Sequence, residues 1–338
     1  MLSVDDLTVS FPTEDGLVRA VRGVSYEVRR NEVFGIVGES GCGKSVSTMA
    51  LMGLLPKTAR ISGQATYLGQ PLLGRPDREV RQLRGSKIAM IFQDPMTSLN
   101  PVYTVERQLA EAVLAHHRIA PKLARERAIE MLDLVGIPQA KQRAKSYPHE
   151  FSGGMRQRVM IAMAIINDPD IIIADEPTTA LDVTVQAQIL ETLMDVKDKV
   201  GAAIVLITHD LGVIASVADR VGVMYAGKFV EAASIDDIFE STRMPYTAGL
   251  LGSIPDLDAE SDHLVPIEGT PPTLINPKPG CPFRPRCPLA TDICATDEPI
   301  LAQSDRPAHL VACHHWQAVA DEPNSAALFD RTLQAGQQ

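Results

Sequence analysis

Short apolar runs alternate with longer segments of mixed polarity along much of this chain. Four such runs are expected to be buried strands, at residues 33–37, 88–92, 171–174 and 203–207. The segments at residues 45–55, 159–166 and 183–200 are expected to be helices, and Pro56 should end the first of them. Strands that alternate with helices predict an α/β fold with a parallel sheet.

Other parts of the chain show strand patterns outside this alternation. Residues 2–11 and 18–28 are expected to be strands joined by a turn at residues 12–16. A further strand is expected at residues 61–68, followed by a short helix at residues 78–84. Residues 221–224 and 228–231 are expected to form a hairpin or strand pair around Ala226 and Gly227.

A helical block interrupts the alternation at residues 104–148. Thr104 is a suitable N-cap for a first helix, and a second helix is expected at about residues 123–135, ended by Gly136 and Pro138. We therefore predict a helical subdomain at about residues 94–168.

Composition narrows the classes of protein to consider. The chain has 338 residues, enough for two domains or one large domain with an appendage. Its net charge is −10, and no segment of the chain is rich in lysine or arginine. A large nucleic-acid-binding face is therefore not expected. No apolar run approaches the roughly 18–20 residues that span a bilayer. The N-terminal residues include Asp5 and Asp6 and do not resemble a signal peptide, so we expect a cytoplasmic location.

One segment matches the phosphate-loop pattern G-x-x-x-x-G-K-[ST] at every fixed position: Gly38-Glu39-Ser40-Gly41-Cys42-Gly43-Lys44-Ser45. It lies between an expected strand and an expected helix, as the pattern requires. Its glycines let backbone N–H groups converge on an anion, and the helix N-terminus adds partial positive charge. Lys44 is then placed to reach the β and γ phosphates, and the Ser45 hydroxyl to bind Mg²⁺. The alternative is a glycine-rich turn that fits by chance.

Polar side chains follow three of the other expected strands. Gln93 is placed to bind Mg²⁺ or a water, unless it only bonds a loop backbone. Asp175 is placed to bind Mg²⁺, directly or through water, and Glu176 to polarise the attacking water. The apolar strand that runs into this acidic pair argues against a merely solvated loop. His209 would lie at the carboxyl edge of the parallel sheet, where ligands collect, although a lone histidine is more often structural.

A second helix N-terminus has the features of a phosphate site. Ser152 is a suitable N-cap, and Gly153 and Gly154 leave backbone N–H groups uncovered. The alternative is an ordinary Ser-Gly cap. Phe11 could stack on a nucleotide base or be a core or edge aromatic, with Val18 as the alternative contact.

Four of the five cysteines lie together near the C-terminus, at Cys281, Cys287, Cys294 and Cys313. They follow a proline-rich stretch from residue 266 to residue 288, where regular structure should be short. A reducing compartment favours a metal over disulfides. The cysteines lack the close pairs of zinc ribbons and suit an iron–sulfur cluster better, with zinc and free thiols as alternatives and His309, His314 and His315 as reserve ligands.

Taken together, these motifs resemble the ATP-binding subunits of ABC transporters over about residues 1–255. The matching motifs, in order, are the Walker A loop (Gly38 to Ser45), Gln93 in the Q-loop, the Ser152-Gly153-Gly154 signature, Asp175 and Glu176 in Walker B, the Ala180-Leu181-Asp182 D-loop and His209 in the H-loop. The fold that this resemblance implies is an α/β P-loop ATPase with an antiparallel β subdomain and a helical subdomain. Met155 departs from the family, which usually has Gln there.

Finer features resemble the dipeptide and oligopeptide importers. They are the segments at residues 93–101, 151–158 and 244–251 and the four-cysteine region, which in that group is associated with a [4Fe-4S] cluster. The third segment begins with Met244 where the group usually has His. The resemblance divides the chain into an ATPase domain at residues 1–255, a cysteine-rich region at 256–320 and a flexible tail at 321–338.

The resemblance also implies ligands and partners. ATP would bind the phosphate loop and Val46, with Phe11, the signature and Asp182 completing the site, and Mg²⁺ would bind Ser45, Gln93 and Asp175. Glu176, His209 and Gln93 would act in hydrolysis, with Gln93 sensing the γ-phosphate. The partners would be a second ATPase subunit, favoured as a paralogue, two membrane permease subunits and an extracytoplasmic peptide-binding protein, with this chain on the cytoplasmic face of the inner membrane. Alternatives are import of nickel or glutathione, and a soluble ABC ATPase of repair or translation.

Overall fold

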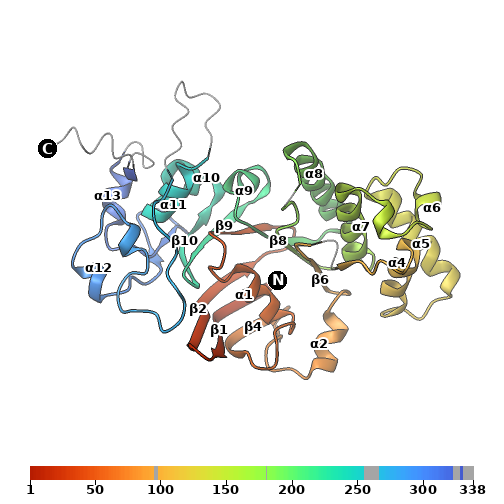
Figure 1. Ribbon diagram of the computed structural model, residues 1–338, viewed down its shortest axis with the longest axis horizontal. Helices are drawn as coiled ribbons and strands as arrows, with labels where there is room; N and C mark the ends of the chain where they lie inside the picture. The colour runs from red at the N-terminus through yellow and green to blue at the C-terminus, as the bar shows by residue number, and fades with distance from the viewer. Residues whose placement is uncertain (95–97, 180, 255–265, 323–327, 330–338) are drawn as a thin grey trace. The chain divides into compact units, whose positions relative to one another are not determined.

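A computed structural model describes residues 1–94, 98–179, 181–254, 266–322 and 328–329 (Figure 1). The chain divides into two compact units. The first unit comprises residues 1–2, 28–33 and 67–207, and the second comprises residues 3–27, 34–66 and 208–338. Residues 95–97, Ala180 of the D-loop and the predicted boundary at residues 255–256 lie outside the described residues.

The first unit is built on parallel strands in the order β8-β7-β6. These are β6 (Ile88–Ile91), β7 (Ile171–Asp175) and β8 (Ala203–Thr208), with Ile171 opposite both Ile88 and Ala203. Every residue of β7 is buried. Isoleucine-rich runs of this kind suit a strand that is covered on both faces, so the expected parallel core is present.

Most of the other described elements of the first unit are helices. The helices α4 (Val105–Leu114), α5 (Pro121–Leu134), α6 (Ala140–Arg143) and α7 (Gly153–Ile165) lie together, as Figure 1 shows in yellow and green. The helix α5 packs on α4 and on α7, and α7 packs on α8 (Val183–Val200). The remaining elements are α2 (Asp77–Leu83), β5 (Gln70–Pro71) and the short 3-10 helix η1 (Pro148–Glu150).

The second unit contains two groups of strands. The strands β1 (Leu2–Thr13), β2 (Gly16–Val28) and β4 (Arg60–Tyr67) lie in the order β2-β1-β4, and only two residues join β1 to β2, as in an antiparallel hairpin. The strands β3 (Val33–Val37), β9 (Arg220–Tyr225) and β10 (Lys228–Ser234) lie side by side in another sheet. There β9 runs parallel to β3 and antiparallel to β10. The turn between β9 and β10 has positive φ at Ala226 and Gly227, which suits a tight hairpin.

Helices α1 (Lys44–Leu51), α9 (Leu211–Val217), α10 (Ile235–Ser241) and α11 (Pro245–Leu251) complete this part of the second unit. The helix α1 ends four residues before the predicted end at residue 55. Met52 is its C-cap, and Gly53 adopts a left-handed φ of 59°. Glycine therefore ends this helix before Pro56 can.

The C-terminal segment joins the sheet of the second unit. Its short elements are η2 (Arg284–Arg286), α12 (Ile293–Thr296), β11 (Ala302–Gln303), β12 (Leu310–Val311) and α13 (Trp316–Ala320). The strand β12 pairs antiparallel with β10, with Val311 opposite Glu231, and β11 pairs with β12. Backbone hydrogen bonds therefore tie this segment to β10.

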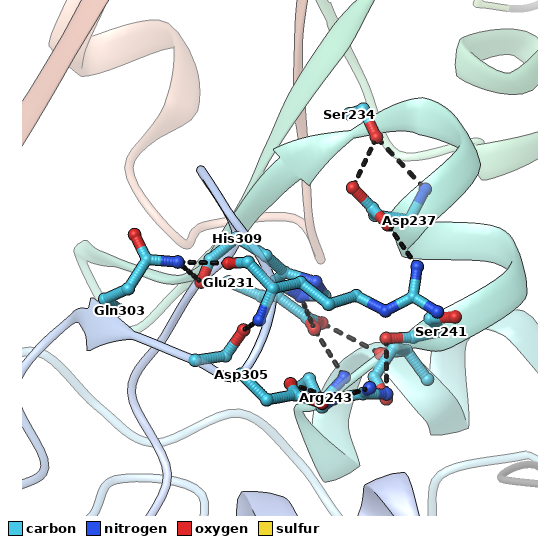
Figure 2. Close-up of polar contacts among 11 residues, drawn as sticks. Glu231, Ser234, Asp237, Ser241, Arg243, Gln303, Asp305 and His309 are labelled. Carbon is cyan, nitrogen blue, oxygen red and sulfur yellow. Dashed lines mark hydrogen bonds and ion pairs between the residues drawn. The ribbon is translucent and has the colours of Figure 1, made fainter.

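A buried polar cluster strengthens the same connection. Figure 2 shows Glu231 of β10 together with residues of α10 and of the C-terminal segment. Glu231 and His309 are both fully buried, and His309 Nε2 lies 2.8 Å from the Glu231 carboxylate. That carboxylate also accepts hydrogen bonds from the Thr242 hydroxyl and from the Arg243 backbone N–H. A buried carboxylate needs such partners, because desolvation of an unpaired charge is costly.

Candidate functional site

The phosphate loop lies between β3 and α1, as predicted. A Cβ atom at Gly38 would lie 2.1 Å from the Met224 carbonyl oxygen, and one at Gly43 would lie 2.2 Å from the Ala20 carbonyl oxygen. Gly43 also has a φ of 106°. Glycine is required at both positions because backbone atoms cannot move aside cheaply. The loop is therefore held tightly against β9 and β2.

The lysine of the loop lies against the loop itself. The Lys44 ammonium donates to the carbonyl oxygens of Gly38 at 2.6 Å and Glu39 at 3.1 Å, and the side chain is buried. Gly43, the N-cap of α1, has no side chain with which to cover the first N–H groups of the helix. Backbone donors and one ammonium group thus gather at a helix N-terminus, an arrangement suited to a phosphate.

Two residues that the sequence reasoning did not find also contact this loop. Arg286 of η2 forms a double hydrogen bond with the Glu39 carboxylate, at 2.7 and 2.8 Å. The Glu39 backbone N–H donates to the Tyr246 hydroxyl at 2.9 Å. Both partners are more than 200 residues away along the chain, so no local pattern could have indicated them.

The first unit brings two of the predicted catalytic residues together. Gln93 Nε2 donates to the Glu176 carboxylate at 3.1 Å, since β6 and β7 are neighbouring parallel strands that both end at this edge. Thr179 also donates to that carboxylate, at 2.7 Å, and was not predicted. Glu176 has a positive φ of 47°, which turns the chain immediately after the buried Asp175. The Glu176 carboxylate is therefore held by defined donors at the carboxyl edge of the strands, where ligands bind in open α/β sheets.

The predicted signature also forms in the first unit. Ser152 is the N-cap of α7, and its hydroxyl accepts from the Met155 backbone N–H at 3.4 Å. A Cβ atom at Gly154 would lie 2.7 Å from a methyl group of Val185. Asp182 caps α8 and accepts from the Val185 N–H at 3.0 Å. Val185 is thus a shared contact of the signature and of the D-loop aspartate.

The remaining predicted residues of the nucleotide site have no role that the structure defines. Phe11 in β1 is partly exposed, Val46 in α1 is partly exposed, and His209 follows β8 and is exposed. Val18 forms a bridge with Ile275 of the C-terminal segment. The nucleotide-binding, Mg²⁺-binding and catalytic roles of all the predicted site residues, including Phe11, Val46 and His209, therefore stay predictions.

The iron–sulfur prediction for Cys281, Cys287, Cys294 and Cys313 is not supported. Among the described residues, no group of three or more His, Cys, Asp or Glu side chains is placed to hold a metal ion. Burial raises the pKa of Cys287 to about 11 and that of Cys313 to about 12. The reserve ligand His309 lies against Glu231 instead. Backbone packing, such as the Cys281 N–H to Cys294 carbonyl bond of 2.8 Å, sets the positions of these thiols.

We find no candidate membrane span among the described residues, since none of their helices combines the necessary length with the necessary hydrophobicity.

Two protein families match this chain, and solved structures share its fold. The ABC transporter family matches residues 21–179, and the oligopeptide/dipeptide transporter C-terminal region matches residues 230–294. The fold resembles the dimeric structure of MJ0796, a bacterial ABC transporter cassette, with a TM-score of 0.62 and 27% identity. That match covers 70% of this chain and 99% of the solved one. The chain therefore has the ABC ATPase fold, as predicted.

Curated relatives are more similar in sequence. The dipeptide transport ATP-binding protein DppD of Bacillus subtilis is 56% identical over 87% of this chain and 88% of its own length. The oligopeptide transport ATP-binding protein OppD of Escherichia coli is 50% identical over 93% of this chain and 92% of its own. OppD of Mycobacterium tuberculosis is 56% identical over 89% of this chain, which spans only 50% of that longer relative. The chain belongs to the family of ABC transporter ATP-binding proteins of the oligopeptide and dipeptide type.

Proposed function

We propose that this chain is the ATP-hydrolysing subunit that powers uptake of dipeptides or oligopeptides. The observation that carries the ATPase part is the Glu176 carboxylate, held by Gln93 and Thr179 at the end of a buried strand. A carboxylate fixed in this way can orient and polarise an attacking water. The peptide part rests on relatives whose names give dipeptide or oligopeptide transport.

In the proposed mechanism, Lys44 and the phosphate-loop N–H groups bind the triphosphate of ATP. Ser45, Gln93 and Asp175 would hold Mg²⁺, which offsets phosphate charge in the transition state. Two such subunits would pair head to tail, so that the Ser152 helix of one faces the phosphate loop of the other. ATP would then favour the closed pair, and hydrolysis would release it, a population shift that drives transport.

The proposal includes partners and a location. The second ATPase subunit would be a paralogue, and two permease subunits would hold the pair at the cytoplasmic face of the inner membrane. An extracytoplasmic protein would deliver the peptide. We keep the division into residues 1–255, with a helical subdomain at about 94–168, then 256–320 and 321–338, as part of this proposal. We include no iron–sulfur cluster, because no group of side chains among the described residues is placed to hold a metal ion.

The test is ATP-driven uptake of a labelled dipeptide into proteoliposomes that contain this chain with its membrane subunits. Glu176→Gln should retain ATP binding and lower turnover by about 10²- to 10⁴-fold, the range expected for loss of a general base. Lys44→Ala should lose ATP binding. Glu191→Gln, which changes an exposed carboxylate on α8, should leave turnover near that of the wild type.

Two results would contradict the proposal in different ways. Unchanged turnover in Glu176→Gln would remove the base assignment and leave the transporter role. Uptake of nickel or glutathione in place of peptide would replace the substrate and leave the ATPase chemistry.

A further inference from the structure

The Glu39 carboxylate, which lies within the phosphate loop, is paired with a nearly buried arginine from the C-terminal segment. Arg286 Nη1 and Nη2 donate to the two carboxylate oxygens at 2.7 and 2.8 Å. The exposed fraction is 4% for the Arg286 side chain and 25% for that of Glu39. Two parallel hydrogen bonds between a guanidinium and a carboxylate fix orientation as well as charge.

The guanidinium of Arg286 is held in place by its own surroundings. Its Nε donates to the Glu268 carbonyl at 3.0 Å, and its Nη2 donates to the Ile267 carbonyl at 3.3 Å. It also lies 5.9 Å from the ring centres of Tyr225 and Phe283. The hydrogen bond to Glu39 raises the pKa of Arg286 above its usual range, so this side chain stays charged. Little conformational freedom remains to be lost when the pair forms.

The backbone of Glu39 is held as firmly as its side chain. Its N–H donates to the Tyr246 hydroxyl, and its carbonyl accepts from the Lys44 ammonium. Tyr246 is fully buried and packs on Tyr225 and Phe283, with ring centres 4.5 and 5.4 Å away. The three polar groups of this loop residue are therefore bound by Arg286, Tyr246 and Lys44.

An unpaired carboxylate at this position would disfavour ATP, because it lies in the loop proposed to bind phosphates and like charges repel. We propose that Arg286 is a positioning residue for the phosphate loop, which neutralises Glu39 and holds the loop in the conformation that receives triphosphate. This inference rests on the proposed function of ATP binding. It makes the C-terminal segment part of the nucleotide site rather than a separate attachment. A loop fixed before binding loses less entropy when the ligand arrives.

The test compares two variants that each break an arginine–carboxylate pair of the C-terminal segment. Arg286→Gln should weaken MgATP binding to the full chain by about tenfold, since removal of one partner leaves the other charge unpaired. Asp305→Asn breaks the pair with Arg243, whose Nη2 and Nε each donate to the Asp305 carboxylate at 3.0 Å. The Asp305→Asn variant should keep an MgATP affinity within about twofold of the wild-type value, a much smaller change than the tenfold loss expected for Arg286→Gln. Isothermal titration with MgATP and melting temperature are measured for each.

Kinetics and a double variant distinguish a positioning role of Arg286 from a general loss of stability. Arg286→Gln should raise KM for ATP and leave kcat at saturating ATP close to the wild-type value, as for an interaction lost in binding. Glu39→Gln combined with Arg286→Gln should recover most of the lost affinity, because removing both charges costs less than removing one. Arg286→Lys keeps the positive charge but cannot form the two parallel hydrogen bonds of a guanidinium. The KM of this variant for ATP should rise by about threefold.

The possible outcomes distinguish failure of the proposed ATP-binding function from failure of the positioning role of Arg286. Wild-type chain that does not bind MgATP overturns the proposed function. Wild-type binding with equal losses in Arg286→Gln and Asp305→Asn, or a double variant no better than Arg286→Gln, overturns the positioning role alone. Should Arg286→Gln fail to fold, Arg286→Lys decides, and a KM equal to that of the wild type overturns the role.

Discussion

At the scale of single residues, the glycines of the phosphate loop differ in what surrounds them. Gly43 combines a left-handed φ of 106° with a backbone oxygen 2.2 Å from the position of an added Cβ. Gly41 also has a positive φ, of 79°, but nothing lies within 4 Å of its added Cβ. Conformation alone therefore restricts Gly41, while conformation and packing together restrict Gly43.

This difference predicts unequal effects of the same substitution. Gly41→Ala should lower the free energy of unfolding by about 1–2 kcal/mol, the cost of a left-handed alanine. Gly43→Ala should cost clearly more and should also abolish MgATP binding, because Ala20 or the loop must shift. Urea unfolding and MgATP titration of both variants provide the measurement. Equal losses in the two variants would show that packing against Ala20 does not matter.

At the scale of elements, side chains cap the helices near the predicted sites. Asp182 accepts from the Val185 N–H at the start of α8, and Gly201 adopts a left-handed φ of 68° at its end. A carboxylate at an N-cap satisfies a backbone donor and interacts favourably with the helix dipole. The helix thus begins and ends at residues with a specific capping role.

Loss of the Asp182 cap should therefore destabilise the first unit. We expect Asp182→Ala to lower the free energy of unfolding by about 0.5–2 kcal/mol. Asp195→Ala is the matched control, since Asp195 is an exposed residue within α8 and alanine is the better helix former. Urea unfolding followed by circular dichroism gives both values. A loss in Asp195→Ala as large as that in Asp182→Ala would contradict the capping role.

At the scale of the whole molecule, ion pairs join the C-terminal segment to the rest of the second unit. Arg306 lies 2.7 Å from Asp237 of α10, and Arg243 lies 3.0 Å from Asp305. Hydrogen bonds from Ser234 and Arg306 lower the pKa of Asp237, and a hydrogen bond from Arg243 lowers that of Asp305. These contacts lie around the buried pair of Glu231 and His309 (Figure 2).

A lowered carboxyl pKa links stability to pH in one direction. The contributions of Asp237 and Asp305 are complete above the unfolded-state value of 3.8 and are lost as pH falls through the lower folded-state values. Arg306→Ala should therefore reduce the difference in unfolding free energy between pH 7 and pH 3. Arg81→Ala, which removes an exposed pair with Asp77 on α2, should leave that difference nearly unchanged. Urea unfolding at both pH values tests this, and an unaltered difference in Arg306→Ala would contradict it.

Much of the fold and of the candidate site is local in origin and could be predicted. The spacing of glycines around Lys44, the apolar run before Asp175 and the cap at Ser152 each act within a few residues. Their conformations follow from backbone sterics, strand burial and capping, which neighbouring residues decide. The contact of Gln93 with Glu176 is not local in this sense, because it depends on β6 and β7 being neighbours in the sheet.

Only the tertiary structure could reveal the contacts between distant segments. Arg286 and Glu39 are 247 residues apart, and Glu231 and His309 are 78 residues apart. Strand and helix periods carry no information about such pairs, because the packing of whole segments brings them together. The cysteines also show that a sequence pattern does not determine the contacts between distant residues. Their spacing favoured a metal, but the positions of their thiols depend on how the C-terminal segment packs, and that packing places no metal-holding group among the described residues.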